Sequence, residues 1–266
     1  MKTSSRISER FAKLRASGEL GLVAYITAGD PSLERTLDFA LALDEAGADV
    51  LELGVPFSDP LADGVVIQRG VERALRAGTN LAGILALVAR LRQHSQIPVV
   101  IFSYLNPILR YGFARFGDEA AAAGADGVLL TDVSVEEAEP FVEESRRVGL
   151  DTIFLAAPTS TERRLRAIAG HSRGFVYAVS RTGVTGAQQA LSGQLMPLIE
   201  RLRAVTDLPI AAGFGISRPE HMALLRGKIE AAVVGSALVQ MIEEHGSHAD
   251  GPRRLADFAR ELKHGS

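Results

Sequence analysis

Two carboxylates stand eleven residues apart where an apolar segment gives way to a loop. Glu52 lies within the predicted buried strand 48–54, and Asp63 lies in the Pro-, Asp- and Gly-rich loop that follows it. An ionised carboxylate inside an apolar strand is costly unless it is paired or used, so Glu52 is a candidate for chemistry. A strand-anchored acid that faces a loop carboxylate suits general acid–base catalysis, because different environments move two pKa values apart.

Each of these acids also has a purely structural interpretation. Glu52 is expected, on that interpretation, to bond to strand backbone or to a neighbouring tyrosine. Asp63 would then be the N-cap of the helix that starts near Gly64. Asp59 precedes Pro60 and is a natural turn residue. The spacing alone leaves these alternatives open.

Glycine-rich turns late in the chain predict a phosphate site. The segments 212–217 and 234–237 each follow an apolar run and lead into a predicted helix, and a third Gly-rich loop spans 181–186. Backbone N–H groups at a helix start bind phosphate, and glycine lets the anion approach closely. Tight turns that need positive φ are the alternative.

The long loop 180–192 is predicted to be a lid over the substrate, with a surface loop as its alternative.

The lysines and histidines of the chain lie away from the predicted carboxyl ends of the strands. The four lysines and six histidines fall in predicted helices, lower loops or the chain ends. A Schiff base and a metal site with ligand spacing are therefore not expected. The chain has no cysteine, so it has no disulfides and no thiolate ligands. We expect cofactor-free acid–base chemistry on a phosphorylated substrate.

The composition is that of an ordinary globular protein. The 266 residues are 47% hydrophobic and 23% charged, with a formal net charge of −3. No dense Lys/Arg block indicates nucleic acid or an anionic membrane as a partner. Residues 1–20 have the pattern of a polar amphipathic helix rather than a signal peptide, and no apolar run approaches the ~18–20 residues that span a bilayer. We expect a cytoplasmic protein with a small-molecule partner.

The elements that must position these residues follow a βα repeat. Short β-branched runs recur roughly every 25 to 30 residues, and each is followed by a segment of helical period. Eight such units predict an α/β fold, a (β/α)8 TIM barrel with an additional N-terminal helix, as a single domain over residues 1–266. The competitor is a doubly wound open sheet, which usually has fewer strands and a Gly-rich fingerprint after the first one. The predicted strands cover residues 21–27, 48–54, 98–104, 127–132, 152–157, 175–180, 209–214 and 231–236.

The two ends of such a barrel have different tasks. Ala-Gly-Ala-Asp at 46–49 and 123–126 reads as a glycine C-cap followed by the lower end of a strand, so Asp49 and Asp126 are expected at the stability face. We expect the N-terminal helix to plug this floor. The carboxyl ends of the strands face the active site and carry Glu52, Ser58, Asp59, Asp63, Tyr104, Asn106, Asp132, Tyr177, Ser180, Arg181, Thr182 and Thr185. The predicted helices cover residues 32–46, 67–77, 81–94, 113–123, 135–148, 161–169, 195–205 and 219–225.

Four segments of the chain closely resemble the tryptophan synthase alpha subunit family. They are Leu51 to Gly64, Phe102 to Pro107, Ser180 to Gly186 and Gly213 to Ser217, and the motif from Glu52 to Gly64 is highly specific. The likeness runs over nearly the whole chain. It implies a TIM barrel that cleaves indole-3-glycerol phosphate, by a retro-aldol reaction, into indole and glyceraldehyde 3-phosphate.

The resemblance also implies roles for single residues. Glu52 matches the catalytic glutamate, which protonates indole C3 and helps remove the side-chain hydroxyl proton. Asp63 matches the aspartate that binds the indole N–H and stabilises the positive charge that develops on the ring. Thr185 matches the lid residue that contacts this aspartate on closure, and Tyr177 lies near the glutamate in the family.

Binding residues are implied in the same way. The phosphate site would be formed by Gly186, Phe214, Gly215, Gly235 and Ser236. The indole pocket would be lined by Tyr25, Ile67, Phe102 and Leu129. Asp59, Pro60 and Asn106 would contact a beta subunit in an alpha2beta2 heterotetramer. That partner is a pyridoxal-phosphate enzyme which receives indole through a tunnel, and no cofactor or metal is expected in this chain.

Two positions depart from the family pattern. Val65 stands where a proline commonly opens the helix, and Thr131 stands where a small or apolar residue is expected.

Three other functions are alternatives to the one that the resemblance implies. The first alternative is a stand-alone lyase that releases free indole. The second is a mainly allosteric partner subunit with weak chemistry of its own. Another phosphate-binding barrel, such as an isomerase of the same pathway, is disfavoured by the Glu52 and Asp63 motif.

Overall fold

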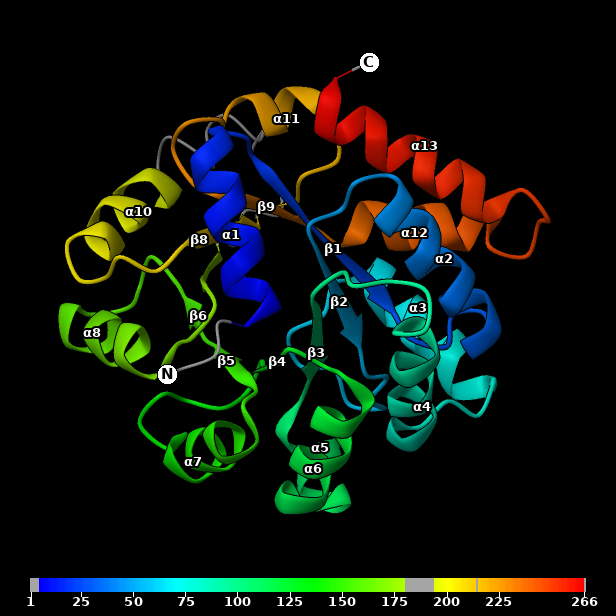
Figure 1. The fold of residues 1–266 in the computed structure, drawn as a ribbon, viewed down its shortest axis with the longest axis horizontal. Helices are drawn as coiled ribbons and strands as arrows, with labels where there is room; N and C mark the ends of the chain where they lie inside the picture. The colour runs from blue at the N-terminus through cyan, green and yellow to red at the C-terminus, as the bar shows by residue number, and fades with distance from the viewer. Residues whose placement is uncertain (1–4, 180–193, 214, 266) are drawn as a thin grey trace.

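Parallel strands form the centre of the molecule (Figure 1). The computed structural model describes residues 5–179, 194–213 and 215–265, and within them nine strands lie in the order β5-β4-β3-β2-β1-β9-β8-β7-β6. Their bounds are β1 Gly21–Thr27, β2 Val50–Gly54, β3 Val99–Ser103, β4 Gly127–Leu130, β5 Asp151–Ile153, β6 Leu155–Ala156, β7 Val176–Val179, β8 Ile210–Gly213 and β9 Ala231–Val234. Every pairing between neighbours in this sheet is parallel, as the βα repeat predicts.

The fifth predicted strand is divided between two partners. Its first half, β5, pairs with β4, and its second half, β6, pairs with β7. The Tyr177 N–H donates to the Phe154 carbonyl between the halves, with 3.1 Å between N and O. The segment therefore changes partner without leaving the sheet, which nearly closes the barrel. The predicted TIM barrel is confirmed, with the continuous strand 152–157 corrected to β5 and β6.

Helices surround the strands on all sides in Figure 1. The described ones are α1 Arg6–Ser17, α2 Leu33–Glu45, α3 Val65–Arg76, α4 Leu81–Leu91, α5 Leu105–Tyr111, α6 Phe113–Ala123, α7 Glu139–Val148, α8 Glu162–His171, α10 Met196–Arg203, α11 Pro219–Ala223, α12 Ser236–His245 and α13 Gly251–His264. The helix predicted from residue 135 begins only at Glu139, where Pro140 occupies the first turn. No single helix among the described ranges is long and apolar enough to cross a membrane, and one pair, α3 with α4, passes by combined length and composition but is bent by 95°.

Alternation along each strand separates two apolar cores. In β2, Leu51 and Leu53 point outward into the layer between strands and helices, whereas Val50 belongs to the cluster inside the barrel. Side chains two residues apart share a face of the sheet. Glu52 therefore shares the inner face with Val50, one layer nearer the carboxyl ends of the strands.

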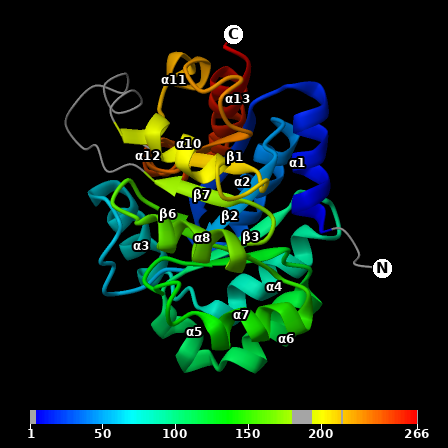
Figure 2. The ribbon, with the colours of Figure 1, turned by 90° about the vertical axis from the view of Figure 1, so that its left-hand side faces the viewer.

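Helix α1 closes the floor of the barrel, as predicted. Its buried residues Ile7, Phe11 and Leu14 recur with helical spacing and join the inner cluster. The rings of Phe11 and Phe175 lie 5.3 Å apart between centroids. Figure 2 shows α1 running along one side of the molecule, outside the ends of the strands. Burial of one helical face here fills the lower end of the barrel with side chains.

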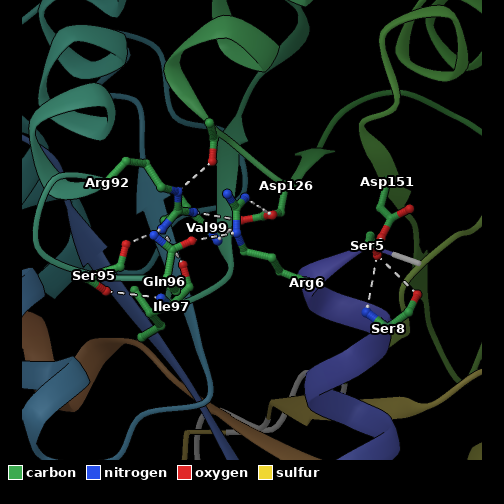
Figure 3. A network of polar contacts seen from close by, with 11 residues as sticks. Ser5, Arg6, Ser8, Arg92, Ser95, Gln96, Ile97, Val99, Asp126 and Asp151 are labelled. Carbon is green, nitrogen blue, oxygen red and sulfur yellow. Dashed lines mark hydrogen bonds and ion pairs between the residues drawn. The ribbon is translucent and has the colours of Figure 1, made fainter. Parts of the chain in front are cut away.

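Polar contacts fix α1 in place around its apolar face (Figure 3). The Asp126 carboxylate accepts from the Val99 N–H at the start of β3, over 2.8 Å, and pairs with Arg6 of α1 at 2.7 Å. Ser5 caps α1 and also donates to the Asp151 carboxylate. The Asp126 carboxylate thus joins the start of β3 to helix α1, which covers the lower end of the barrel.

The same arrangement recurs at other strands. Asp49 accepts from the Leu22 N–H over 2.7 Å, and Glu230 accepts from the Ile210 N–H over the same distance. Each acid immediately precedes a strand and bonds to the first residues of the strand beside it. The prediction that Asp49 and Asp126 serve the stability face is confirmed.

Candidate active site

Glu52 lies inside the barrel, on the inner face of β2. It is aligned with Tyr25 of β1 and Val100 of β3, and its side chain is 0% exposed. Neither carboxylate oxygen has a hydrogen-bond partner among the described residues. The alternative of a structural carboxylate bonded to backbone or tyrosine is therefore wrong for this part of the chain. Burial raises the pKa of Glu52 to about 8, so the group is protonated at neutral pH.

Two tyrosines lie near this carboxyl group, one on the neighbouring strand β1 and one on β7 across the barrel. Tyr25 and Tyr177 are both buried in the inner layer, and burial raises the pKa of each hydroxyl well above its ordinary value. The nearby charge of Glu52 raises both pKa values further. The structure thus brings Tyr25, Glu52 and Tyr177 together, although they are far apart in sequence.

Glycines on the inner face make room for the tyrosine hydroxyls. A Cβ atom added at Gly54 would lie 2.2 Å from Tyr25 Oη, and one added at Gly213 would lie 2.6 Å from Tyr177 Oη. Both distances are far below a normal contact, so any larger residue would displace the ring. The small residues at these strand ends leave the space that the site uses.

Asp63 lies on the loop that follows β2, at the barrel mouth. Helix α3 begins at Val65 with Gly64 as its N-cap, and no side chain caps it. The alternative of Asp63 as helix cap is therefore wrong. Burial raises the pKa of Asp63, and a hydrogen bond from Tyr104 opposes that rise. The Asp63 charge also raises the pKa of Tyr25, which places both carboxylates around the same tyrosine.

The N-terminus of a helix lies beside the same tyrosine. Gly235 follows β9 and is the N-cap of α12, whose first residue is Ser236, and no side chain of the described residues caps this helix. A helix N-terminus of this kind suits an anion such as phosphate. A Cβ atom at Gly235 would lie 3.4 Å from Tyr25 Cδ1, so the turn borders the pocket directly. Gly215 adopts a φ of 82° after β8, a conformation that favours glycine.

The apolar residues predicted for the pocket have different positions. The Phe102 ring packs edge-on against Tyr25, with 5.1 Å between centroids, and Leu129 is fully buried on the inner face of β4. Ile67 lies in the first turn of α3, close in sequence to Asp63. The predicted residues Thr185, Gly186 and Phe214, with the predicted lid, lie outside the described residues.

An exposed apolar face surrounds the loop that carries Asp63. Asp59 and Asn106 are exposed, Pro60 is half-buried, and Ser58 donates to the Asp59 carboxylate over 2.6 Å. Among the described residues, the large apolar side chains that are exposed all belong to this loop, α3 or α5, and they are Leu61, Val65, Leu75 and Leu109. Exposed apolar patches are typical of protein interaction surfaces. A groove beside them is lined by Phe57 and Pro107 among others.

Thr27 is a site feature that sequence reasoning missed. Five buried side-chain atoms in the described residues lack a hydrogen-bond partner, and three of them are Thr27 Oγ1 and the two oxygens of Glu52. A buried polar atom without a partner is rare in a folded protein, and the Glu52 carboxyl group supplies two of the five. Within the described ranges, no group of three His, Cys, Asp or Glu residues is arranged to hold a metal ion.

Comparison with known proteins gives one consistent result. The family model for the tryptophan synthase alpha chain matches residues 11–266. The chain is 55% identical over 261 residues to the tryptophan synthase alpha chain of Solibacter usitatus, with 98% of each chain covered. It is 48% identical over 262 residues to that of Geotalea uraniireducens, which covers 98% of this chain and 97% of the relative.

Solved structures agree with this result. Tryptophan synthase subunit alpha from Legionella pneumophila superposes with a TM-score of 0.90 at 35% identity, and 98% of each chain is covered. A chain of the tryptophan synthase complex from Pyrococcus furiosus superposes with a TM-score of 0.84 at 41% identity, covering 91% of this chain and 97% of that one.

Proposed function

The chain belongs to the tryptophan synthase alpha chain family, and we propose that Glu52 and Asp63 carry the family's reaction in it. That reaction is a lyase step of tryptophan biosynthesis, the cleavage of indole-3-glycerol phosphate into indole and glyceraldehyde 3-phosphate. The observation that carries the residue assignment is the Glu52 carboxyl group, which is fully buried and lacks a hydrogen-bond partner among the described residues. Its pKa of about 8 provides a proton donor at neutral pH.

The proposed role of Glu52 is proton transfer in both directions. Its proton goes to indole C3, which turns the ring into a cationic indolenine and an electron sink. The resulting carboxylate then takes the proton of the side-chain hydroxyl as the bond from C3 to the glycerol carbon breaks. The bonding electrons return to the ring, the aldehyde forms, and Glu52 ends protonated as it began.

The proposed role of Asp63 is to hold the indole N–H and stabilise the positive charge that develops there. Only an ionised carboxylate supplies that charge; burial raises the pKa of Asp63, and the hydrogen bond from Tyr104, which opposes that rise, supports the role. Tyr25, Phe102, Leu129 and Ile67 are proposed to line the indole pocket. The phosphate is proposed to bind at Gly215, Gly235 and Ser236, together with Gly186 and Phe214 from outside the described residues, and Tyr177 and Thr185 are proposed to contact the substrate or Asp63.

A beta subunit is the proposed partner, in an alpha2beta2 assembly. A solved relative from Pyrococcus furiosus is a tryptophan synthase complex, and the exposed apolar residues around Asp59, Pro60 and Asn106 supply a surface for such a partner. Indole is proposed to pass from this chain to that subunit. Pyridoxal phosphate is assigned to the partner, and the proposed steps in this chain use no cofactor. The absence of cysteine suits a cytoplasmic location, which is part of the proposal.

The test is indole release from indole-3-glycerol phosphate by purified variants. We expect Glu52→Gln to lower kcat at least about a thousandfold, because an amide cannot donate and recover the proton. Asp63→Asn is expected to lower kcat about a hundredfold, because an amide still contacts the N–H but carries no charge. Glu143→Gln and Asp257→Asn change exposed acids in the same way and serve as matched controls.

The residue assignment fails if Glu52→Gln retains near wild-type turnover. If Asp63→Asn lowers the melting temperature but leaves kcat unchanged, Asp63 has a structural role only. These variants therefore separate the chemical role of each carboxylate from its contribution to folding.

A further inference from the structure

Tyr104 is a buried tyrosine to which the proposed chemistry gives no task. It follows β3 directly, is 3% exposed and is the N-cap residue of α5. Its hydroxyl accepts a hydrogen bond from the Ala62 N–H, with 2.9 Å between N and Oη. Its ring packs against Phe57 at 5.4 Å between centroids. Ala62 and Phe57 both belong to the loop that carries Asp63, so one side chain from β3 holds this loop at two points.

The hydrogen bonds around the Tyr104 hydroxyl determine where its proton points. A phenol oxygen donates one hydrogen bond and accepts others, and the Ala62 N–H takes one accepting position. Burial raises the pKa of Tyr104, and the hydrogen bond from the Ala62 N–H opposes that rise.

Asp63 lies one residue beyond Ala62 in this loop. Burial raises the pKa of Asp63, and a hydrogen bond from Tyr104 opposes that rise. Because the Ala62 N–H donates to the Tyr104 oxygen, the phenol proton remains to be donated to Asp63. A phenylalanine at this position would fill the same space but could neither accept from Ala62 nor donate to Asp63.

We propose that Tyr104 is a positioning residue that holds the loop with Asp63, and so keeps this carboxylate aimed at the indole N–H. The inference rests on the proposed role of Asp63. Because positive charge develops on the ring only after C3 is protonated, a correctly held carboxylate acts on kcat more than on substrate binding.

The experiment measures kcat, KM and the pH dependence of indole release for Tyr104→Phe, with Tyr111→Phe as the matched control. Tyr111 bonds through its hydroxyl to Glu119 on the outside of the barrel. We expect Tyr104→Phe to lower kcat about tenfold with KM changed less than about twofold, since a hydrogen bond to a charged group is lost. The acidic limb of the profile should move to higher pH, because the pKa of Asp63 rises without this bond.

A double variant tests whether the Tyr104 hydroxyl acts through Asp63. In an Asp63→Asn background, Tyr104→Phe should lower kcat by less than about twofold, because the hydroxyl acts through the carboxylate.

Three results would overturn the inference. They are an unchanged kcat and acidic limb in Tyr104→Phe, an equal loss in Tyr111→Phe, or full additivity of Tyr104→Phe with Asp63→Asn. A wild-type chain that releases no indole would instead contradict the proposed function. If the wild type cleaves the substrate, Asp63→Asn impairs cleavage and Tyr104→Phe does not, the proposed function stands and only this inference is contradicted.

Discussion

At the scale of single residues, the environment of Glu52 determines its protonation state. The carboxyl group is enclosed by strand side chains and two tyrosines, and its pKa of about 8 lies well above the ordinary value of 4.5. Asp63 sits at the mouth and keeps a hydrogen-bond donor. Burial raises the pKa of both acids, but the rise at Asp63 is opposed by the hydrogen bond from Tyr104, whereas nothing opposes it at Glu52.

The raised pKa of Glu52 predicts a pH-dependent stability for the wild-type chain. A buried group with a raised pKa contributes stability that is fully present below pH 4.5 and is lost as pH rises to about 8. The Glu52→Gln variant has no titrating group at this position. We therefore expect the difference in free energy of unfolding, variant minus wild type, to be larger at pH 8 than at pH 4.5 by at least about 1 kcal/mol. Urea denaturation at several pH values measures the difference. A difference that stays constant with pH would mean that Glu52 is ionised in the folded chain.

The chemical residues were predictable only in part from the sequence. Glu52 stands out because a carboxylate interrupts an apolar strand. Tyr104 was expected at the barrel mouth, but its bond to the Ala62 N–H depends on the path of a loop that no periodicity describes. Thr27 carried no signal, since a threonine in a strand is ordinary and only burial without a partner marks it.

At the scale of elements, each barrel end is built for a different purpose. The floor consists of α1 and the acids that precede the strands, and the mouth consists of glycine turns and the loop with Asp63. The positions of strands and most helices followed from hydrophobic period. Three helices were not among the predicted elements: α5, which follows β3 directly, α12 and α13. The division of β5 from β6 was not predicted either, because it reflects barrel closure, a property of the whole sheet.

The floor predicts that Asp126→Asn destabilises the chain without affecting catalysis. The carboxylate is 4% exposed and pairs with Arg6 and Arg92, each at 2.7 Å. Removing its charge leaves Arg92 without its partner, so the free energy of unfolding should fall by about 2–4 kcal/mol. Urea denaturation tests this, with the exposed Asp118→Asn as control. A loss below about 0.5 kcal/mol, or a loss of kcat/KM in the folded variant, would contradict the assignment of this residue to the floor.

The mouth predicts a graded response at Gly235. Alanine should be tolerated there, because its Cβ would lie 3.4 Å from Tyr25 Cδ1, an ordinary contact. Gly235→Leu extends into the anion position and should weaken binding of glycerol 3-phosphate at least about tenfold, as measured by calorimetry. Gly170→Leu is the control, since its added Cβ would meet nothing within 4 Å. Unchanged affinity in Gly235→Leu would remove this turn from the phosphate site.

At the scale of the whole molecule, the site and the proposed partner surface share one loop. The residues from Phe57 to Asp63 carry exposed apolar and polar side chains, and the Asp63 carboxylate lies at the end of this segment. A partner that binds the exposed face would therefore order the segment that aims Asp63. This sharing favours a subunit whose chemistry is coupled to assembly over a stand-alone lyase or a purely allosteric chain.

The most direct test is the rate of indole release from indole-3-glycerol phosphate by the purified chain, with and without an added tryptophan synthase beta subunit. We predict slow release by the chain alone and a rise of about tenfold or more with the partner. Fast release that the partner leaves unchanged would contradict the coupling and support a stand-alone lyase. No release under either condition would contradict the proposed function itself.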